Sequence, residues 1–222
     1  MIVEAGNMMK GLTLAFTVAQ FTSTRPYLYH LTSQSNFERL LRSRELVCAS
    51  ELLKASKNED WITRKRLATL TIQINGESID LRDQQPLYAG KTVLEGGWNF
   101  AELVRQLNGR VFFWPGWRDK PVSYAERHFE RYEDEKPVIV RVGTQELFDQ
   151  NMQAAPLFCK YNSGSPRTTQ GLGSPRGPDT FIECHRASYT ASGVVEVTYL
   201  KSVQLPRKIE SGVSPWGPWT AH

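Results

Sequence analysis

The residues best placed to do chemistry early in the chain are a histidine and a threonine, His30 and Thr32. They end an apolar, aromatic run over residues 27–31, which favours a β-strand. A serine follows directly, and Ser35 and Glu38 have the spacing of a capping box, so we expect a helix to begin there. Backbone N–H groups at a helix start favour anions. This junction therefore predicts a place for a nucleotide, although a purely structural histidine is the alternative.

A second candidate is Arg82, at the end of a predicted β-hairpin. Residues 70–74 alternate in polarity as a strand does, Asn75-Gly76 is a strong two-residue turn signal, and residues 78–83 form the returning strand. A guanidinium group matches the paired oxygens of a phosphate or pyrophosphate. Arg82 is therefore a candidate for binding an anionic ligand. The alternative is a surface ion pair with Asp83, which would contribute little stability.

An aromatic run over residues 112–114 follows a helix predicted over residues 99–107. Three consecutive aromatic residues place rings on both faces of a strand, which predicts a central, buried strand. Within it, Phe113 is a candidate for lining a binding site. Trp114, near the strand end, is a candidate for stacking on a base or another planar ring. The alternative is that the strand contributes only to the core.

The segment over residues 161–178 is rich in Gly, Pro, Ser and Arg. It is either a linker of low complexity or, inside a domain, a long loop that covers a site. Arg167 and Arg176 repeat the setting Ser-Pro-Arg, and two arginines on a mobile loop suit the capture of phosphate or nucleic acid. We expect strands over residues 179–184 and 194–200 after this loop.

Composition sets the bounds of these expectations. The 222 residues include 27 Lys+Arg and 23 Asp+Glu, a net charge of +4, with 40% hydrophobic residues. Such a chain can form one compact domain, and its mild basicity tolerates a polyanionic partner without requiring one. The three cysteines and four histidines lack metal-ligand spacing, so we expect no metal and a reducing, cytoplasmic location. The apolar run over residues 11–21 predicts a leading helix or a strand that covers the domain.

The segment that carries His30, Leu31, Thr32 and Asn36 resembles the opening motif of the DarT-type ADP-ribosyltransferases. This resemblance implies that His30, Thr32 and Asn36 bind NAD as a substrate, with Arg82 on its pyrophosphate. The aromatic strand with Phe113 is similar to a strand of that family that leads to its substrate-facing loop.

The resemblance also implies the architecture. We expect an α+β domain over residues 25–207, in which two packed sheets of the ADP-ribosyltransferase-like, split type form a cleft and helices lie outside. An N-terminal helix or extension (residues 1–24) and a loosely docked tail (residues 208–222) would flank it.

Catalysis in that family needs a carboxylate on a late strand, because positive charge develops on the ribose as nicotinamide leaves. This chain has Thr180 where the pattern places that glutamate. Asp179 and Glu183 are therefore the catalytic candidates, together with Arg82, and Glu196 is a further alternative.

The function implied by the resemblance is a NAD-dependent mono-ADP-ribosyltransferase that modifies a nucleic-acid base (in DNA or RNA) or a protein. A toxin or a phage-defence role would accompany it. Arg167, Arg176 and Trp114 would contact the acceptor. Two alternatives remain open, namely a non-catalytic module that binds a nucleotide or ADP-ribose, and a NAD glycohydrolase.

Overall fold

The computed structural model describes residues 15–168, 170 and 172–222, and the chain folds into a mixed α+β structure. The helices are α1 (Val18–Thr24), α2 (Gln34–Ser43), α3 (Ala49–Ala55), α4 (Phe100–Asn108), α5 (Ser123–Arg131) and α6 (Thr144–Gln150). The strands are β1 (Tyr27–Thr32), β2 (Glu45–Val47), β3 (Leu70–Ile74), β4 (Glu77–Leu81), β5 (Thr92–Leu94), β6 (Arg110–Trp117), β7 (Lys120–Pro121), β8 (Val138–Gly143), β9 (Leu157–Cys159), β10 (Ser174–Arg176), β11 (Glu196–Leu200), β12 (Ser202–Gln204), β13 (Glu210–Gly212) and β14 (Thr220–Ala221).

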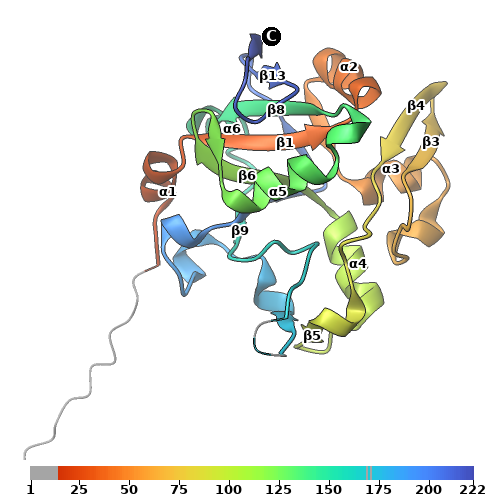
Figure 1. Ribbon diagram of the computed structural model, residues 1–222, viewed down its shortest axis with the longest axis vertical. Coiled ribbons are helices and arrows are strands. Elements are labelled where there is room, and N and C mark those ends of the chain that lie inside the picture. Colours follow the sequence, from red (N-terminus) through yellow and green to blue (C-terminus); the bar gives the residue numbers. More distant parts are fainter. Residues whose placement is uncertain (1–14, 169, 171) are drawn as a thin grey trace, which may run out of the picture.

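Most strands join one eight-stranded sheet in the order β14-β13-β8-β1-β6-β11-β9, with β7 paired to β6. Neighbouring strands in this sheet run antiparallel. The pairs β3–β4, β2–β12 and the parallel pair β5–β10 form three small sheets. Figure 1 shows the β3–β4 hairpin standing away from the large sheet beside α3. The sequence prediction of a central aromatic strand is confirmed, because β6 lies in the middle of the large sheet.

The large sheet splits at β6. β1 pairs only with the second half of β6, from Tyr27 opposite Gly116 to Tyr29 opposite Trp114. β11 pairs on the other edge with the first half of β6, up to Phe113. After Tyr29, β1 therefore leaves β6. The expected two sheets are instead one sheet whose two groups of strands share β6.

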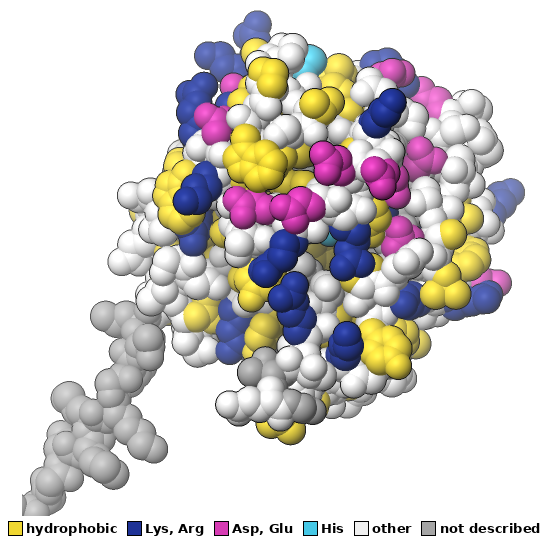
Figure 2. Space-filling view, viewed as in Figure 1, with side chains coloured by type: hydrophobic (Ala, Val, Ile, Leu, Met, Phe, Trp, Pro, Cys, Tyr) yellow, Lys and Arg dark blue, Asp and Glu magenta, His cyan; other side chains and the backbone are white. Residues whose placement is uncertain are grey.

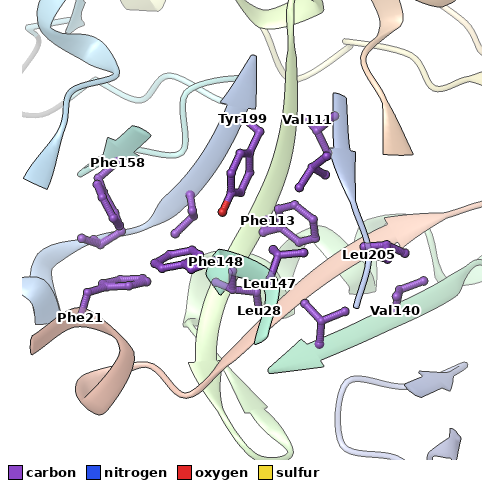
Figure 3. Close-up of a cluster of buried hydrophobic side chains, with 14 of the residues drawn as sticks. Phe21, Leu28, Val111, Phe113, Val140, Leu147, Phe148, Phe158, Tyr199 and Leu205 are labelled. Atoms are coloured by element: carbon purple, nitrogen blue, oxygen red, sulfur yellow. The ribbon is translucent and has the colours of Figure 1, made fainter. Parts of the chain in front are cut away.

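The main core covers one face of this sheet. Figure 3 shows side chains from β1, β6, β8 and β11 meeting those of α1 and α6. Phe113 lies in this core with no exposed surface, as do Leu28 and Tyr199. Burying each such side chain contributes roughly 1.5–3 kcal/mol to folding.

The opposite face carries two smaller clusters. In one, Phe129 of α5 packs with Tyr29 and Trp114, and Figure 1 shows α5 beside β1 and β6. In the other, Phe112 packs with α4 and with Phe181. Side chains alternate along a strand, so Phe112 and Trp114 point away from the face that Phe113 covers.

Several local predictions are confirmed. The β3–β4 hairpin turns at Asn75 and Gly76, whose φ angles are 52° and 82°, as a tight hairpin turn requires. Asn99 caps α4, its side chain accepting a hydrogen bond from the backbone N–H of Glu102 at 2.9 Å. Ser33, rather than Ser35, caps α2.

Two predicted elements differ in the structure. Residues 179–184 do not form a strand, because 3₁₀ turns occupy Pro178–Thr180 and Cys184–Arg186, and only Ile182 bridges to Phe158. Residues 208–222 are not loosely docked, because β13 pairs with β8 and β14 extends the sheet further.

The predicted apolar segment at residues 11–21 is described only in part. Its first residues, Gly11–Leu14, lie outside the described residues, and its end forms the first turn of α1. No helix in the described part of the chain has the length and apolar character needed to cross a membrane.

Candidate functional site

A cavity of about 660 Å³ opens where β1 has left β6. This volume falls in the range of small-molecule sites, roughly 300–1,000 Å³. Five residues predicted from the sequence to act at a site line this one cavity, namely His30, Thr32, Asn36, Arg82 and Trp114, and so does Glu196, the further alternative for the catalytic carboxylate. The face of the molecule seen in Figure 2 is mixed in charge, with acidic side chains over α5 and basic ones just below them.

His30 occupies the gap between the two diverging strands. Its Nδ1 lies 2.9 Å from the carbonyl oxygen of Phe112. Because a carbonyl only accepts hydrogen bonds, Nδ1 carries the proton and Nε2 is an acceptor. Burial lowers the pKa of His30 to about 4, with the Arg82 charge adding to this effect and the Phe112 carbonyl opposing it. His30 is therefore neutral at physiological pH, and it offers an acceptor to a ligand hydroxyl.

Arg82 follows β4, and its positively charged side chain lines the same cavity. Its guanidinium lies 4.3 Å from the centre of the Tyr132 ring, and its Nη2 lies 3.5 Å from the Glu135 carboxylate. Its Nη1 is buried and has no hydrogen-bond partner among the described residues. Burial lowers the pKa of Arg82, and the charge of Glu135 opposes this shift. An anionic group of a ligand would supply the missing partner.

Asn36 supports Arg82 from α2. Its Nδ2 donates to the backbone carbonyl of Asp80 at 2.8 Å, and the Asp80 N–H donates to its Oδ1 at 3.1 Å. The side-chain amide thus forms the pair of backbone hydrogen bonds that a neighbouring strand would form. It holds β4 in place at Asp80, two residues before Arg82. Because both ends of the amide are used in this way, the observed role of Asn36 is to position the hairpin.

Among the carboxylate residues that line the cavity, the buried one is Glu196, at the start of β11. Its side chain is buried (2% exposed), and its Oε1 accepts the backbone N–H of Ser163 at 3.1 Å. Its Oε2 has no partner among the described residues. Burial raises the pKa of Glu196 to about 7, while the neighbouring Ser163 and the charge of Arg176 act in the opposite direction. The sequence signal for Glu196 is a single charge inside the apolar run Val194–Val197.

The two predicted catalytic carboxylates lie elsewhere. The Asp179 side chain is 80% exposed and pairs with Arg186 at 3.0 Å. The Glu183 side chain is about half exposed and lies 3.1 Å from His185. Neither residue lines the cavity. The cause is the turn structure of residues 178–186, which replaces the expected strand.

The two arginines expected on a mobile capture loop are also placed differently. Arg176 is buried, and its guanidinium donates to the carbonyl groups of Asn162 at 2.9 Å, Ser163 at 3.3 Å and Pro175 at 2.8 Å. It therefore holds the loop that presents Ser163 to Glu196. Arg167 is exposed and does not line the cavity.

The aromatic wall of the cavity is shifted by one residue from the expectation for Phe113. Phe113 lies in the main core, while Phe112 and Trp114 line the cavity. The Trp114 ring lies tilted against the His128 ring, with the ring centres 4.5 Å apart, and its Nε1 is buried without a partner among the described residues. Among the described residues, no cluster of three or more His, Cys, Asp or Glu side chains is arranged to hold a metal ion.

Comparison with known proteins gives one match. Residues 26–208 match a family model described as "Family of unknown function (DUF7002)". No curated protein and no solved structure matches the chain.

Proposed function

The chain belongs to the DUF7002 family of unknown function, and we propose from its cavity that it is a NAD-dependent mono-ADP-ribosyltransferase. The proposal includes a fold of the ADP-ribosyltransferase type, in which the sheet split at β6 forms the cleft. It draws on the resemblance of the segment around His30 to the DarT-type enzymes. It also draws on the meeting of His30, Arg82 and Glu196 at one cavity.

The observation that carries the proposal is a pair of unpaired polar atoms on residues that line the cavity. Nη1 of Arg82 and Oε2 of Glu196 are buried without partners among the described residues. Leaving such a group unsatisfied costs about 1–3 kcal/mol, and more when it is charged. A dinucleotide offers partners to both, since it carries an anionic pyrophosphate and ribose hydroxyls. The residues therefore fit NAD as a substrate.

Each residue has a defined task in this scheme. NAD supplies an ADP-ribose group whose bond to nicotinamide breaks with the electron pair leaving on nicotinamide, while the acceptor forms the new bond and loses a proton. Arg82 binds the pyrophosphate, and neutral His30 accepts a hydrogen bond from a ribose hydroxyl. Ionised Glu196 stabilises the positive charge that develops on the ribose, or takes the proton of the acceptor. Phe112 and Trp114 provide flat apolar surfaces for a ring.

The acceptor that we propose is a nucleic-acid base or a protein side chain, in a toxin or phage-defence setting. The mild net charge of +4 is compatible with a nucleic acid at the cavity mouth. No metal takes part in the scheme.

The test is incubation of the purified protein with NAD, followed by chromatography of released nicotinamide. Label from adenine-tagged NAD is then followed onto DNA, RNA and protein. Glu196→Gln should abolish nicotinamide release, whereas Asp179→Asn and Glu183→Gln, as matched controls outside the cavity, should retain it. Release that survives in Glu196→Gln would overturn the assignment of this residue.

A second candidate function is a non-catalytic module that binds a nucleotide or ADP-ribose. It is favoured by the burial of Glu196, because a carboxyl group with a pKa of about 7 is partly protonated at neutral pH and can simply donate a hydrogen bond. Stabilisation by NAD without nicotinamide release would support this candidate. Release without label on any macromolecule would indicate a NAD glycohydrolase instead.

A further inference from the structure

Two more arginines, the buried Arg66 and the partly buried Arg110, line the same cavity as Arg82. Arg66 lies in the segment between α3 and β3 and is only 6% exposed. Arg110 begins β6 and lies on the cavity side, in line with Phe112 and Trp114. Neither arginine takes part in the scheme proposed above for NAD.

The guanidinium of Arg66 is held in a fixed position by neutral groups. Its Nε donates to the carbonyl oxygen of Arg82 at 2.9 Å, and its Nη1 donates to Oδ1 of Asn108 at 2.8 Å. Asn108 is itself fixed, because its Nδ2 donates to the carbonyl oxygen of Ile62 at 2.9 Å. Burial lowers the pKa of Arg66 to about 10, with only the Asp83 charge opposing it, so Arg66 stays charged at neutral pH.

Arg110 is held in a similar way. Its Nη1 donates to the backbone carbonyl of Gln106 at 2.7 Å and to Oε1 of the same residue at 2.6 Å. Its guanidinium lies 4.3 Å from the centre of the Phe181 ring. Its Nε is buried without a partner among the described residues. Burial lowers the pKa of Arg110 to about 10, which again leaves the charge in place at neutral pH.

What these two arginines lack is a carboxylate partner. Within the described part of the chain, neither forms an ion pair. By contrast Arg141, which is fully buried away from the cavity, pairs with both Asp119 and Glu210. A buried charge without a counter-charge is costly. An anion that enters the cavity would remove this cost.

We propose that Arg66 and Arg110 form a second anion subsite of the cavity, which takes a phosphate monoester. A phosphate monoester carries a charge of about −1.5 to −2 at pH 7 and three acceptor oxygens, which suits two guanidinium groups. The phosphate monoester is assigned to Arg66 and Arg110, and the pyrophosphate to Arg82. This assignment deepens the proposed function by defining a second phosphate on its substrates, but phosphate binding itself does not require NAD turnover.

Two sources could supply this phosphate. One is an additional phosphate on the dinucleotide, as in NADP compared with NAD. The other is the terminal phosphate of a nucleic-acid acceptor. Both present the same chemistry to Arg66 and Arg110.

The first test uses inorganic phosphate at constant ionic strength, with binding followed by calorimetry and by thermal unfolding. We expect Arg66→Gln and Arg110→Gln to weaken phosphate binding about tenfold or more, as loss of a charge-assisted hydrogen bond implies. The matched control is Arg39→Gln, which removes the same charge from the same cavity. Arg39 already has Glu77 as a partner at 3.7 Å, so this variant should bind phosphate as the wild type does.

The second test identifies the source. Dissociation constants are measured for NAD and NADP, and for one oligonucleotide with a 5′-phosphate or a 5′-hydroxyl. A preference for the phosphorylated member of either pair, lost in Arg66→Gln and Arg110→Gln, supports the subsite. If Arg66→Gln fails to fold because the contact with Arg82 is lost, the result for Arg110→Gln alone decides whether the subsite exists.

The proposal is overturned if the wild type does not bind inorganic phosphate. It is also overturned if Arg39→Gln weakens binding as much as the other two variants do, since the effect would then be the general charge of the cavity. Nicotinamide release is scored separately on the same preparations, so a failure of the transferase proposal leaves the phosphate result readable.

Discussion

At the scale of single residues, the main feature is a carboxyl group held inside a cavity wall. Glu196 keeps one hydrogen bond from a backbone N–H and leaves the other oxygen unpaired among the described residues. Burial makes the charged form costly, and this raises the pKa to about 7. The same property that suits Glu196 to chemistry near neutral pH also costs stability, because the group must ionise inside the protein.

This cost predicts a pH dependence of stability. The ordinary pKa of the group is 4.5, and that of Glu196 in the folded protein is about 7. Between these values the folded state holds a proton that the unfolded chain releases, so the free energy of unfolding falls as pH rises. From pH 4.5 to 8 the contribution is about 3 kcal/mol. Glu196→Gln should remove this fall.

The measurement is urea unfolding of wild type and Glu196→Gln from pH 5 to 8, with Glu183→Gln as the exposed control. The advantage of Glu196→Gln over wild type should grow with pH, while Glu183→Gln should follow wild type. Parallel curves for all three proteins would show that Glu196 does not titrate in this window. In the transferase scheme, nicotinamide release by the wild type should rise through about pH 7, because the ionised carboxylate is needed.

At the scale of elements, the β3–β4 hairpin brings Arg82 to the cavity without joining the large sheet. Its place is set by packing of Ile72 and Ile79 on α3 and by the two hydrogen bonds between Asn36 and Asp80. Arg82 therefore depends on α2 for its position.

Asn36→Ala should release this hairpin. Loss of two partly buried hydrogen bonds is expected to cost about 1–3 kcal/mol of stability. It should also raise the dissociation constant for NAD, because Arg82 is no longer fixed. Ser35→Ala is the control, since its hydroxyl meets the Asp80 carboxylate at 3.0 Å in an exposed place. Calorimetric titration with NAD and urea unfolding check both effects, and equal losses in the two variants would contradict the positioning role of Asn36.

The hairpin and residues 179–184 also show which elements can be predicted from the local sequence. The hairpin could be predicted because Asn75-Gly76 determines its turn without help from distant residues. Residues 179–184 have the polarity of a strand, but Thr180 accepts a hydrogen bond from the Gly177 N–H and a 3₁₀ turn forms instead. The pattern of polar and apolar residues in this segment does not show that a turn competes with the strand.

The site was predictable only in part, for a related reason. His30 and Arg82 carry chemical types that indicate a ligand, and both line the cavity. Which ring of an aromatic run faces a site depends on the sheet register, and a shift of one residue exchanges Phe113 for its neighbours. Glu196 joins the site through pairing of β11 with β6 and β9. Those long-range pairings are not visible in the sequence near Glu196.

At the scale of the whole molecule, the C-terminal segment completes the large sheet. Trp219 covers the guanidinium of Arg141 at 4.1 Å and donates from its Nε1 to Asp119. Arg141 in turn pairs with Asp119 and Glu210. The residues from β13 to β14 thus close an ionic cluster around the buried Arg141 of β8.

Trp219→Ala should therefore destabilise the protein by about 3 kcal/mol, as truncation of a large packed aromatic side chain generally does. Trp216→Ala is the matched control, because that ring is 56% exposed, and its loss should cost less than about 0.5 kcal/mol. Thermal and urea unfolding of both variants check this. A similar loss of stability in both would mean that the tail acts only through nonspecific apolar contact.

The split of the sheet at β6 determines the order in which the walls of the cavity are assembled during synthesis. His30 is synthesised before its cavity partner Glu196, which reaches β6 only when β11 pairs. A ribosome-bound chain that stops before residue 196 lacks one wall of the cavity, so NAD should leave its resistance to proteolysis unchanged. Two fragments divided between α6 and β9 should be inert apart and should regain ligand binding only on mixing, which makes the chain a natural candidate for a complementation reporter.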